Sequence, residues 1–390
     1  MPIDKLKFLG STNTTMPTTT RSRLDAVTEY LVELVSIPSV TSDHEANYKA
    51  IDWVENQLAG LPLTVTRFEH NGAPSLVATT PAVKDPKNPR LWLSGHIDVV
   101  PGTKELFEPQ IRGHIMTGRG VYDMKSAIAV FIALMHEVGD DLAALDLGLM
   151  ITSDEETSGK NGVGWLTAQG YRGQAVLLPD SLKTWQLETG AKGASFWRFT
   201  AYGQEAHGSR IWEGDNAVER LLNFIGVLRA YTVTEPCGDP KHMHHTLNIG
   251  KLSGGIVVNA VPYTAEAHVD IRITPDVTLE EVEKWVKDTQ DIVPGVEAEQ
   301  LPMQAKPSVL PHVGPVELFA RITEEHLGRP LEKVFAHGGT DARWFADVGV
   351  PVITVNPTGG GMHAKNEWVD LKDLALYYDV VRQFVTEWSK

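Results

Sequence analysis

Residues 91–101 read LWLSGHIDVVP, and this stretch is the most informative part of the chain. The apolar residues before Gly95 predict a buried strand, so His96 and Asp98 should lie at its carboxyl end. Open α/β sheets bind ligands at that edge. Because side chains two residues apart share a face, Asp98 can accept one ring N–H of His96 and leave the other ring nitrogen free to bind a metal. We favour this interpretation over a chance pair of surface residues.

Three further segments deliver acids at comparable positions: GRGVYDMK before an apolar helix, and LGLMITSDEE and AVLLPD after apolar strands. The acids are Asp123, Glu155, Glu156 and Asp180. A helix-dipole partner or a solvated acidic loop would explain any one of them alone. Their repetition, with His363 further along, favours one cluster. Imidazole plus carboxylate suits a pair of zinc-like ions, so the sequence predicts a two-metal hydrolase.

The motifs also resemble a known family. In chain order they are GHIDVVP, GRGxxDMK, DEE, a PD after a strand, GGTDAR and HAKNE. They are similar to the dizinc family of acetylornithine deacetylase, succinyl-diaminopimelate desuccinylase, aminoacylase, carboxypeptidase G and the carnosine-type dipeptidases. The resemblance runs from about Thr28 to the C-terminus. It implies a zinc-peptidase-like catalytic domain with an inserted dimerisation domain.

The resemblance assigns roles to the clustered residues. It implies two Zn²⁺ ions per subunit, with Co²⁺ or Mn²⁺ as possible substitutes. The implied ligands are Asp123 bridging both ions, His96 and Asp180 in one site, and Glu156 and His363 in the other. Glu155 would be the general base, with Asp98 behind His96. A cis peptide bond is expected after Asp123.

The periodicity changes at Gly190. Before it, helical segments alternate with apolar strands, which is typical of an α/β fold with a central mixed sheet flanked by helices. After it, the order strand, helix, strand, strand, helix, strand predicts a ferredoxin-like α+β unit. We therefore expect a flexible N-terminal extension at 1–22, a catalytic metal-binding domain at 23–189 and 302–390, and an inserted lid and dimerisation domain at 190–301.

Residues of the inserted domain also carry expected roles. His207 lies in a Gly-flanked turn, which by itself fits a surface histidine. In similar enzymes this His reaches across a homodimer and donates to the oxyanion. The resemblance further implies that Asn259 and Arg272 hold a substrate carboxylate, and that the loops containing Gly338 and Gly361 form the pocket floor through backbone N–H groups. The cluster HMHH at 242–245 falls in an expected loop without a carboxylate at matching strand ends, so we interpret it as surface or adventitious binding.

The implied reaction is metal-dependent hydrolysis of the amide bond of a small N-acyl amino acid or dipeptide with a free carboxylate. A metal-bridged hydroxide would attack and Glu155 would move the proton. Acetylornithine deacetylase or succinyl-diaminopimelate desuccinylase activity is the alternative. Asp180 stands where those relatives usually have Glu, which favours peptides or N-acyl amino acids. A non-catalytic metal-binding or interaction module is the alternative of another class, although it has no reason to keep Glu155.

Composition agrees with this class. At 390 residues, two domains are expected. A net charge of −15 disfavours nucleic acid and anionic membranes as partners. The single cysteine, Cys237, excludes an internal disulfide and leaves nitrogen and oxygen to hold any metal. No apolar run reaches the roughly 18 residues of a membrane helix, and the N-terminus lacks a signal-peptide core, so we expect a cytoplasmic protein.

Overall fold

The structure is a computed structural model that describes residues 18–181, 183–232 and 243–390. The chain divides into two compact units. Unit 1 comprises residues 1–189, 310–334 and 340–390, and unit 2 comprises 190–309 and 335–339. The expected extension at 1–22 falls mainly outside the described residues. Its last part does not, because α1 (Thr18–Val35) begins at Thr18.

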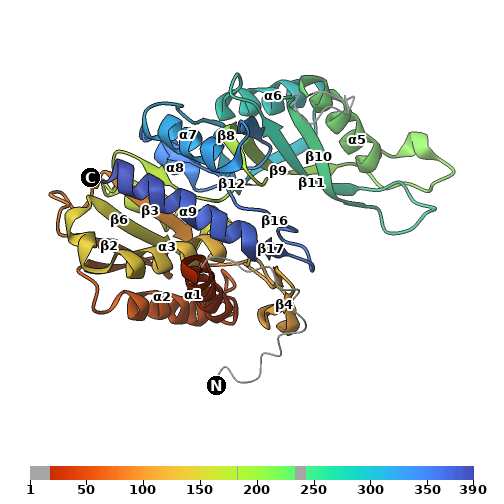
Figure 1. The fold of residues 1–390 in the computed structure, drawn as a ribbon. Helices are drawn as coiled ribbons and strands as arrows, with labels where there is room; N and C mark the ends of the chain where they lie inside the picture. Colours follow the sequence, from red (N-terminus) through yellow and green to blue (C-terminus); the bar gives the residue numbers. More distant parts are fainter. Residues whose placement is uncertain (1–17, 182, 233–242) are drawn as a thin grey trace. The chain divides into compact units, whose positions relative to one another are not determined.

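Unit 1 is built on a six-stranded mixed sheet in the order β1-β2-β6-β3-β7-β15. Its strands β2, β6 and β3 are labelled in Figure 1. Its strands are β1 (Thr64–His70), β2 (Ala73–Thr79), β3 (Leu91–His96), β6 (Leu147–Thr152), β7 (Val176–Leu177) and β15 (Val352–Ile353). The four strands from β6 to β15 pair in parallel, and β1 and β2 form an antiparallel edge hairpin. Every residue of β3 and β6 is buried, as expected for parallel strands covered on both faces.

Helices cover this sheet. They are α1, α2 (His44–Leu58), α3 (Lys125–Val138), α4 (Val163–Ala168), α7 (Pro315–Leu327), α8 (Ala342–Ala346) and α9 (Leu371–Trp388). Eleven consecutive residues of α3 are buried, which is typical of a helix inside a core and not of an amphipathic surface helix. The Asp370 side chain caps α9 by accepting from the N–H groups of Lys372 and Asp373.

A smaller four-stranded sheet in unit 1 has the order β16-β17-β5-β4. Its strands are β4 (Gln110–Arg112), β5 (Ile115–Thr117), β16 (Gly359–Gly360) and β17 (Trp368–Asp370). The pairing of β17 with β5 brings the chain near residue 368 beside the chain near residue 117. Two segments that are far apart in the sequence therefore meet close to the metal-ligand motifs.

Unit 2 is an antiparallel sheet in the order β10-β11-β9-β12 with helices α5 (Ala217–Leu228) and α6 (Leu279–Ile292). The strands are β9 (Gly193–Tyr202), β10 (Thr246–Gly254), β11 (Thr264–Ile273) and β12 (Val296–Ala305). Burial alternates strictly along β11, so its buried side chains contribute to the hydrophobic core of unit 2. The mixed sheet with helices and the separate antiparallel unit confirm the predicted fold class.

Some expected limits need correction. Residues 302–309 group with unit 2 and not with unit 1, because β12 continues beyond the expected end at Leu301 to pair with β9. The segments that carry the chain between the units contain β8 (Gln186–Ala191), β13 (Ser308–Val309) and β14 (Glu332–Ala336). Among the described residues, no helix has the length and apolarity needed to cross a membrane.

Candidate metal centre

His96 ends β3 with a defined orientation of its ring. Its Nδ1 lies 3.0 Å from the backbone carbonyl oxygen of Asp98, closer than the 3.4 Å to the Asp98 carboxylate. A proton on Nδ1 therefore donates to the Asp98 carbonyl and leaves Nε2 with a free lone pair. Nε2 lies 3.1 Å from Asp123 Oδ1. The expected support of His96 by Asp98 thus comes first from the backbone of Asp98.

The Asp98 carboxylate has another set of partners. It is fully buried and accepts from Thr41 Oγ1 at 2.8 Å and from the backbone N–H groups of Glu155 and Glu156, both at 3.3 Å. These two amides begin the short 3₁₀ helix η3 (Glu155–Thr157). Asp98 therefore fixes the start of the segment that carries both glutamates, at the edge of the sheet where β3 and β6 end.

Two groups of side chains could each hold a metal ion. In each group one ligand atom per residue lies within 4.8 Å of the others, and the groups are His96, Glu155 and Asp180, and Asp123, Glu156 and His363. They are the two groups of this kind in the part of the chain that the structure describes. The structure therefore brings together the five expected ligands and the expected base, and it places Glu155 beside His96 and Asp180.

Asp123 belongs to the second group and also contacts the first. Its Oδ1 contacts His96 Nε2, and its Oδ2 lies 3.3 Å from His363 Nε2, which in turn lies 3.0 Å from Glu156 Oε2. The Asp123–Met124 peptide bond is cis, as the resemblance implies. The His363 side chain is 56% exposed, whereas Asp123 is nearly fully buried. One carboxylate thus reaches both imidazoles, and solvent reaches the centre beside His363.

The buried acids raise the proton affinity of the centre. Burial, together with the charge of Asp180, raises the pKa of Glu155 well above its usual value, and burial together with Asp123 does the same for Asp180. Asp123 and Glu156 raise the pKa of His363 to about 10. Buried like charges are costly unless a cation lies among them.

The polar atoms of the centre also fit a cation. Glu156 Oε1 and Asp180 Oδ2 are buried and have no hydrogen-bond partner among the described residues. Buried carboxylate oxygens are normally paired or coordinate metals. Neutral imidazole nitrogens with carboxylate oxygens form the donor set that binds zinc and related ions. The residues present therefore fit a metal pair.

Glu367 organises the centre, a role that we did not predict. It is buried, and its carboxylate accepts from Arg119 Nη1 at 2.7 Å and from the backbone N–H groups of Gly120, Tyr122 and Asp123 at 3.0–3.1 Å. Arg119 Nη2 also donates to the His363 carbonyl at 3.2 Å. The Glu367–Arg119 ion pair therefore connects the loop that carries Asp123 to the loop that carries His363. The sequence feature that could have indicated this role of Glu367 is the acid at the end of the motif HAKNE.

Two other buried ionisable residues were also not assigned. Lys125 Nζ donates to the carbonyls of Leu34 and Ile37 at 3.0 and 2.8 Å, and burial lowers the pKa of this lysine to about 7. Asp341, in the motif GGTDAR, is 1% exposed, and burial together with the charge of Asp154 raises its pKa to about 7. Asp341 packs against the loop that follows Glu156.

In unit 2, two of the expected site residues are neighbours. The exposed His207 pairs with Ala260 in an isolated bridge, and Gly208 N donates to the Asn259 carbonyl at 2.7 Å. The Arg272 guanidinium is half-buried and donates to both carboxylate oxygens of Asp270, at 2.8 and 3.1 Å. His207 and Asn259 therefore belong to one local surface, and the expected carboxylate-binding arginine is paired within its own strand.

The expected pocket-floor glycines lie in different units. Gly338 belongs to unit 2 and Gly361 to unit 1. Gly361 has φ +75°, and a Cβ there would lie 2.8 Å from the Asn366 carbonyl, so the turn before His363 needs glycine. In the HMHH cluster, His242 lies outside the described residues, as does Cys237. His245 Nδ1 accepts from Thr274 N at 3.2 Å.

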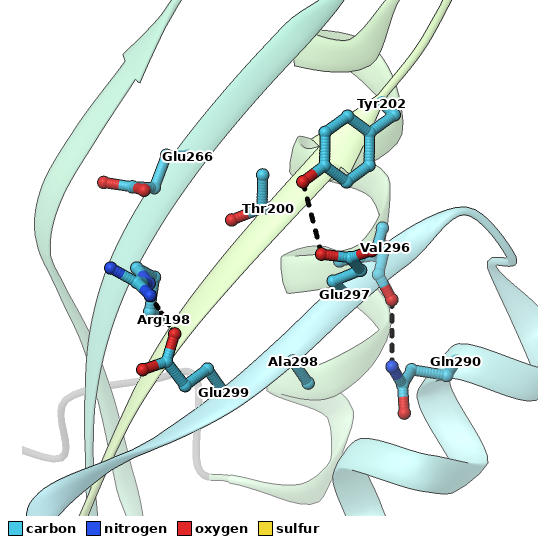
Figure 2. A pocket seen from close by; sticks show the side chains of 9 residues that line it. All are labelled: Arg198, Thr200, Tyr202, Glu266, Gln290, Val296, Glu297, Ala298 and Glu299. Carbon is cyan, nitrogen blue, oxygen red and sulfur yellow. Dashed lines mark hydrogen bonds and ion pairs between the residues drawn. The ribbon is translucent and has the colours of Figure 1, made fainter.

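A separate pocket in unit 2 has no comparable donor set. Figure 2 shows it at β9, β11 and β12, with Arg198, Thr200 and Tyr202 along β9. Arg198 pairs with Glu299, and Tyr202 Oη donates to Glu297 at 3.2 Å. Glu299 and Glu297 thus have partners among the lining residues, whereas Glu156 Oε1 and Asp180 Oδ2 of the metal centre have none among the described residues.

Comparison with known proteins agrees with this geometry. The model of peptidase family M20/M25/M40 matches residues 92–387. The chain is 29% identical over 378 residues to succinyl-diaminopimelate desuccinylase of Rhodospirillum centenum, covering 91% of this chain and 95% of that protein. The corresponding protein of Corynebacterium glutamicum is 28% identical over 369 residues, covering 91% of this chain and 94% of that protein.

Solved structures share the fold. A tripeptidase of Staphylococcus aureus superposes with a TM-score of 0.77 at 21% identity, covering 94% of this chain and 98% of that one. Human carnosine dipeptidase 1 superposes with a TM-score of 0.71 at 14% identity, covering 95% and 97%. Both likenesses extend over almost the whole chain and confirm the predicted architecture.

Proposed function

Since the chain belongs to peptidase family M20/M25/M40, we propose that it cleaves the amide bond of a small N-acyl amino acid or dipeptide that carries a free carboxylate. Membership makes the protein a metallohydrolase of peptide or amide bonds. The observation that carries the finer proposal is the pair of ligand groups joined by Asp123, with the half-buried Glu155 beside them.

We assign the metal pair to five residues. His96 and Asp180 would hold one ion, Glu156 and His363 the other, and Asp123 both. Zn²⁺ is the proposed ion, with Co²⁺ or Mn²⁺ as substitutes, because the donors are two imidazoles and three carboxylates. When bound, the ions would polarise the substrate carbonyl and lower the pKa of the attacking water.

Glu155 is the proposed general base. It takes no part in this ligand set, yet it lies within ligand distance of His96 and Asp180. Burial and the Asp180 charge raise its pKa, which favours holding a proton between its removal from water and its delivery to the leaving amine. Asp98 orients it by accepting from its backbone N–H. This Glu distinguishes an enzyme from a module that only binds metal.

The remaining roles are proposed from the family. His207 would donate to the oxyanion from the partner subunit of a homodimer. Asn259 and Arg272 would hold the substrate carboxylate, for which the planar guanidinium is suited, and Gly338 and Gly361 would contribute backbone N–H groups. To bind that carboxylate, Arg272 would have to give up its hydrogen bonds to Asp270. We assign catalysis to 23–189 and 302–390 and the lid to 190–301, except that residues 302–309 and 335–339 group with the lid unit.

Removal of a succinyl group is the second candidate. Succinyl-diaminopimelate desuccinylases align over about nine-tenths of the chain, while the structural neighbours include a tripeptidase and a dipeptidase. Asp180 favours the peptide or N-acyl amino acid reading. The two candidates differ in the acyl group that is removed, so substrate choice separates them.

The test is a panel of dipeptides, N-acetyl amino acids and N-succinyl diamino acids. The protein is first freed of metal and then loaded separately with zinc, cobalt or manganese. We expect metal-dependent release of a free amine from a dipeptide or an N-acetyl amino acid. Faster release from the succinyl compounds would select the second candidate. Binding of metal with no turnover on any member would favour a non-catalytic metal-binding module.

A further inference from the structure

The loop after the two glutamates reverses direction within two residues. Ser158 and Gly159 have φ of 116° and 60°, and their N–H groups donate back to the carbonyls of Glu155 and Asp154, both at 2.8 Å. A positive φ is costly at Ser158, a residue with a Cβ, and persists where the surroundings impose it. The loop is therefore held by contacts outside itself.

Those contacts come from helix α8, about 185 residues away in the chain. Arg343 Nη2 donates to the Ser158 carbonyl, and Trp344 Nε1 donates to the same oxygen at 3.1 Å. The guanidinium carbon lies 5.1 Å from the centre of the Trp344 ring. Arg343 Nε is buried and has no acceptor among the described residues. In the described part of the chain, the Arg343 guanidinium thus donates its hydrogen bond to the Ser158 carbonyl.

The loop at Gly159 packs closely against Asp341, the N-cap of α8, and helix α4 packs closely against α8 at Gly164. A Cβ at Gly159 would lie 1.7 Å from Asp341 Oδ1, and a Cβ at Gly164 would lie 2.9 Å from the Trp344 ring. The Asp341 carboxylate is buried with neither oxygen hydrogen-bonded in the described part of the chain. Packed interiors transmit displacements because they lack voids. A shift of α8 would therefore move the loop.

We propose that Arg343 is a positioning residue for Glu155. It acts through the Ser158 carbonyl, three residues beyond Glu155, and sets the direction of η3 at its far end, while Asp98 holds the near end. The inference rests on the proposed role of Glu155 as the base. A catalytic group displaced by about 1 Å can lose roughly 10²-fold in rate. The opposing interpretation is that Arg343 contacts the substrate directly.

The test compares Arg343→Ala with the metal-loaded parent on the best substrate of the panel. We expect kcat to fall roughly 10²-fold, KM to stay within about threefold, and the bound metal to equal that of the parent. Low-millimolar guanidinium should restore part of kcat, since it can replace the donor to Ser158. Arg343→Lys should recover little, because an ammonium lacks the planar guanidinium that lies over the Trp344 ring. Trp344→Phe should lower kcat in the same direction.

The matched control is Arg321→Ala, which removes an exposed arginine paired with Glu325 and Glu387. It should leave kcat and KM unchanged and should not respond to guanidinium.

If Arg343→Ala is insoluble, Arg343→Lys and Trp344→Phe carry the test. A rise in KM at unchanged kcat would show substrate contact, loss of metal would show action on the ligands, and a kcat loss without guanidinium rescue would show a general structural role. Each of these results, or no effect at all, overturns the proposal.

Glu155→Gln is measured beside these variants. If it is inactive while Arg343→Ala is normal, the positioning role alone fails. If Glu155→Gln retains parental activity, the proposed base itself is wrong, whatever Arg343→Ala does. The two failures are therefore distinguishable.

Discussion

Glu367 Oε1 accepts a hydrogen bond from the backbone N–H of Asp123 at 3.1 Å, across 244 residues of sequence. The same carboxylate neutralises Arg119, which is only 3% exposed. The residue at the junction of the two ligand groups is thus held by a buried acid that is not itself a candidate ligand. Removing that acid tests how much of the centre depends on it.

Glu367→Gln should destabilise the metal-free protein by about 3 kcal/mol, because it leaves the buried Arg119 guanidinium without its anion. Urea unfolding of the purified variant measures this change. Glu325→Gln removes one of the two partners of the exposed Arg321 and should cost no more than about 0.5 kcal/mol. Equal costs for the two variants would contradict the buried ion pair as a source of stability.

Glu155→Gln should lower kcat by roughly 10²–10⁴-fold while the bound metal stays at the parental amount, because the amide keeps the shape of the side chain but cannot accept a proton. Elemental analysis together with kinetics on the same preparation decides this. Loss of metal along with activity would make Glu155 a ligand, which its position beside His96 and Asp180 also permits.

His363→Ala should remove one ion preferentially, because its group would keep only carboxylates from Glu156 and Asp123. Metal titration of the variant measures the loss. His244→Ala tests the HMHH segment in parallel and should alter neither metal content nor rate. Full occupancy of both sites in His363→Ala would refute the assignment.

Metal binding near neutral pH should release a proton from His363. Asp123 and Glu156 raise its pKa from 6.5 to about 10, so it is protonated in the metal-free protein, whereas a metal needs the neutral imidazole. Metal affinity should rise with pH. Stability from the protonated His363 is fully present below pH 6.5 and lost as pH rises through about 10.

Calorimetry of zinc binding in buffers of different ionisation enthalpy counts the released protons. His363→Ala should release about one proton fewer than the parent. The same proton count in both proteins would show that His363 is already neutral before the metal binds.

Glu155→Gln and His207→Ala should complement each other if His207 acts across a homodimer. Each variant alone is expected to be nearly inactive. After random subunit exchange, half the dimers are mixed and each has one intact site, so about a quarter of parental activity should return. If His207 acts within its own chain, every site stays defective, and verified exchange without recovery would exclude the trans arrangement.

Local signals in the sequence were enough for much of the fold. Helix α9 is an example, because the acidic N-cap Asp370 and a 3.6-residue apolar repeat are encoded next to each other in the chain. The hairpin of β1 and β2 was not expected. Burial does not alternate along β1, and every residue of β2 is buried, so neither strand has the two-residue period of a half-buried strand.

The ligand types and their place at strand ends follow from the sequence, since His96 ends an apolar strand and Glu155, Glu156 and Asp180 each follow one within a few residues. The residues that position these ligands become visible only in the tertiary structure. Glu367 reaches Asp123 because β17 pairs with β5, and Arg343 reaches Ser158 because α8 packs on the loop after η3. Such partners depend on which elements become neighbours in space, and hydrogen bonds between distant segments leave no periodicity in the chain.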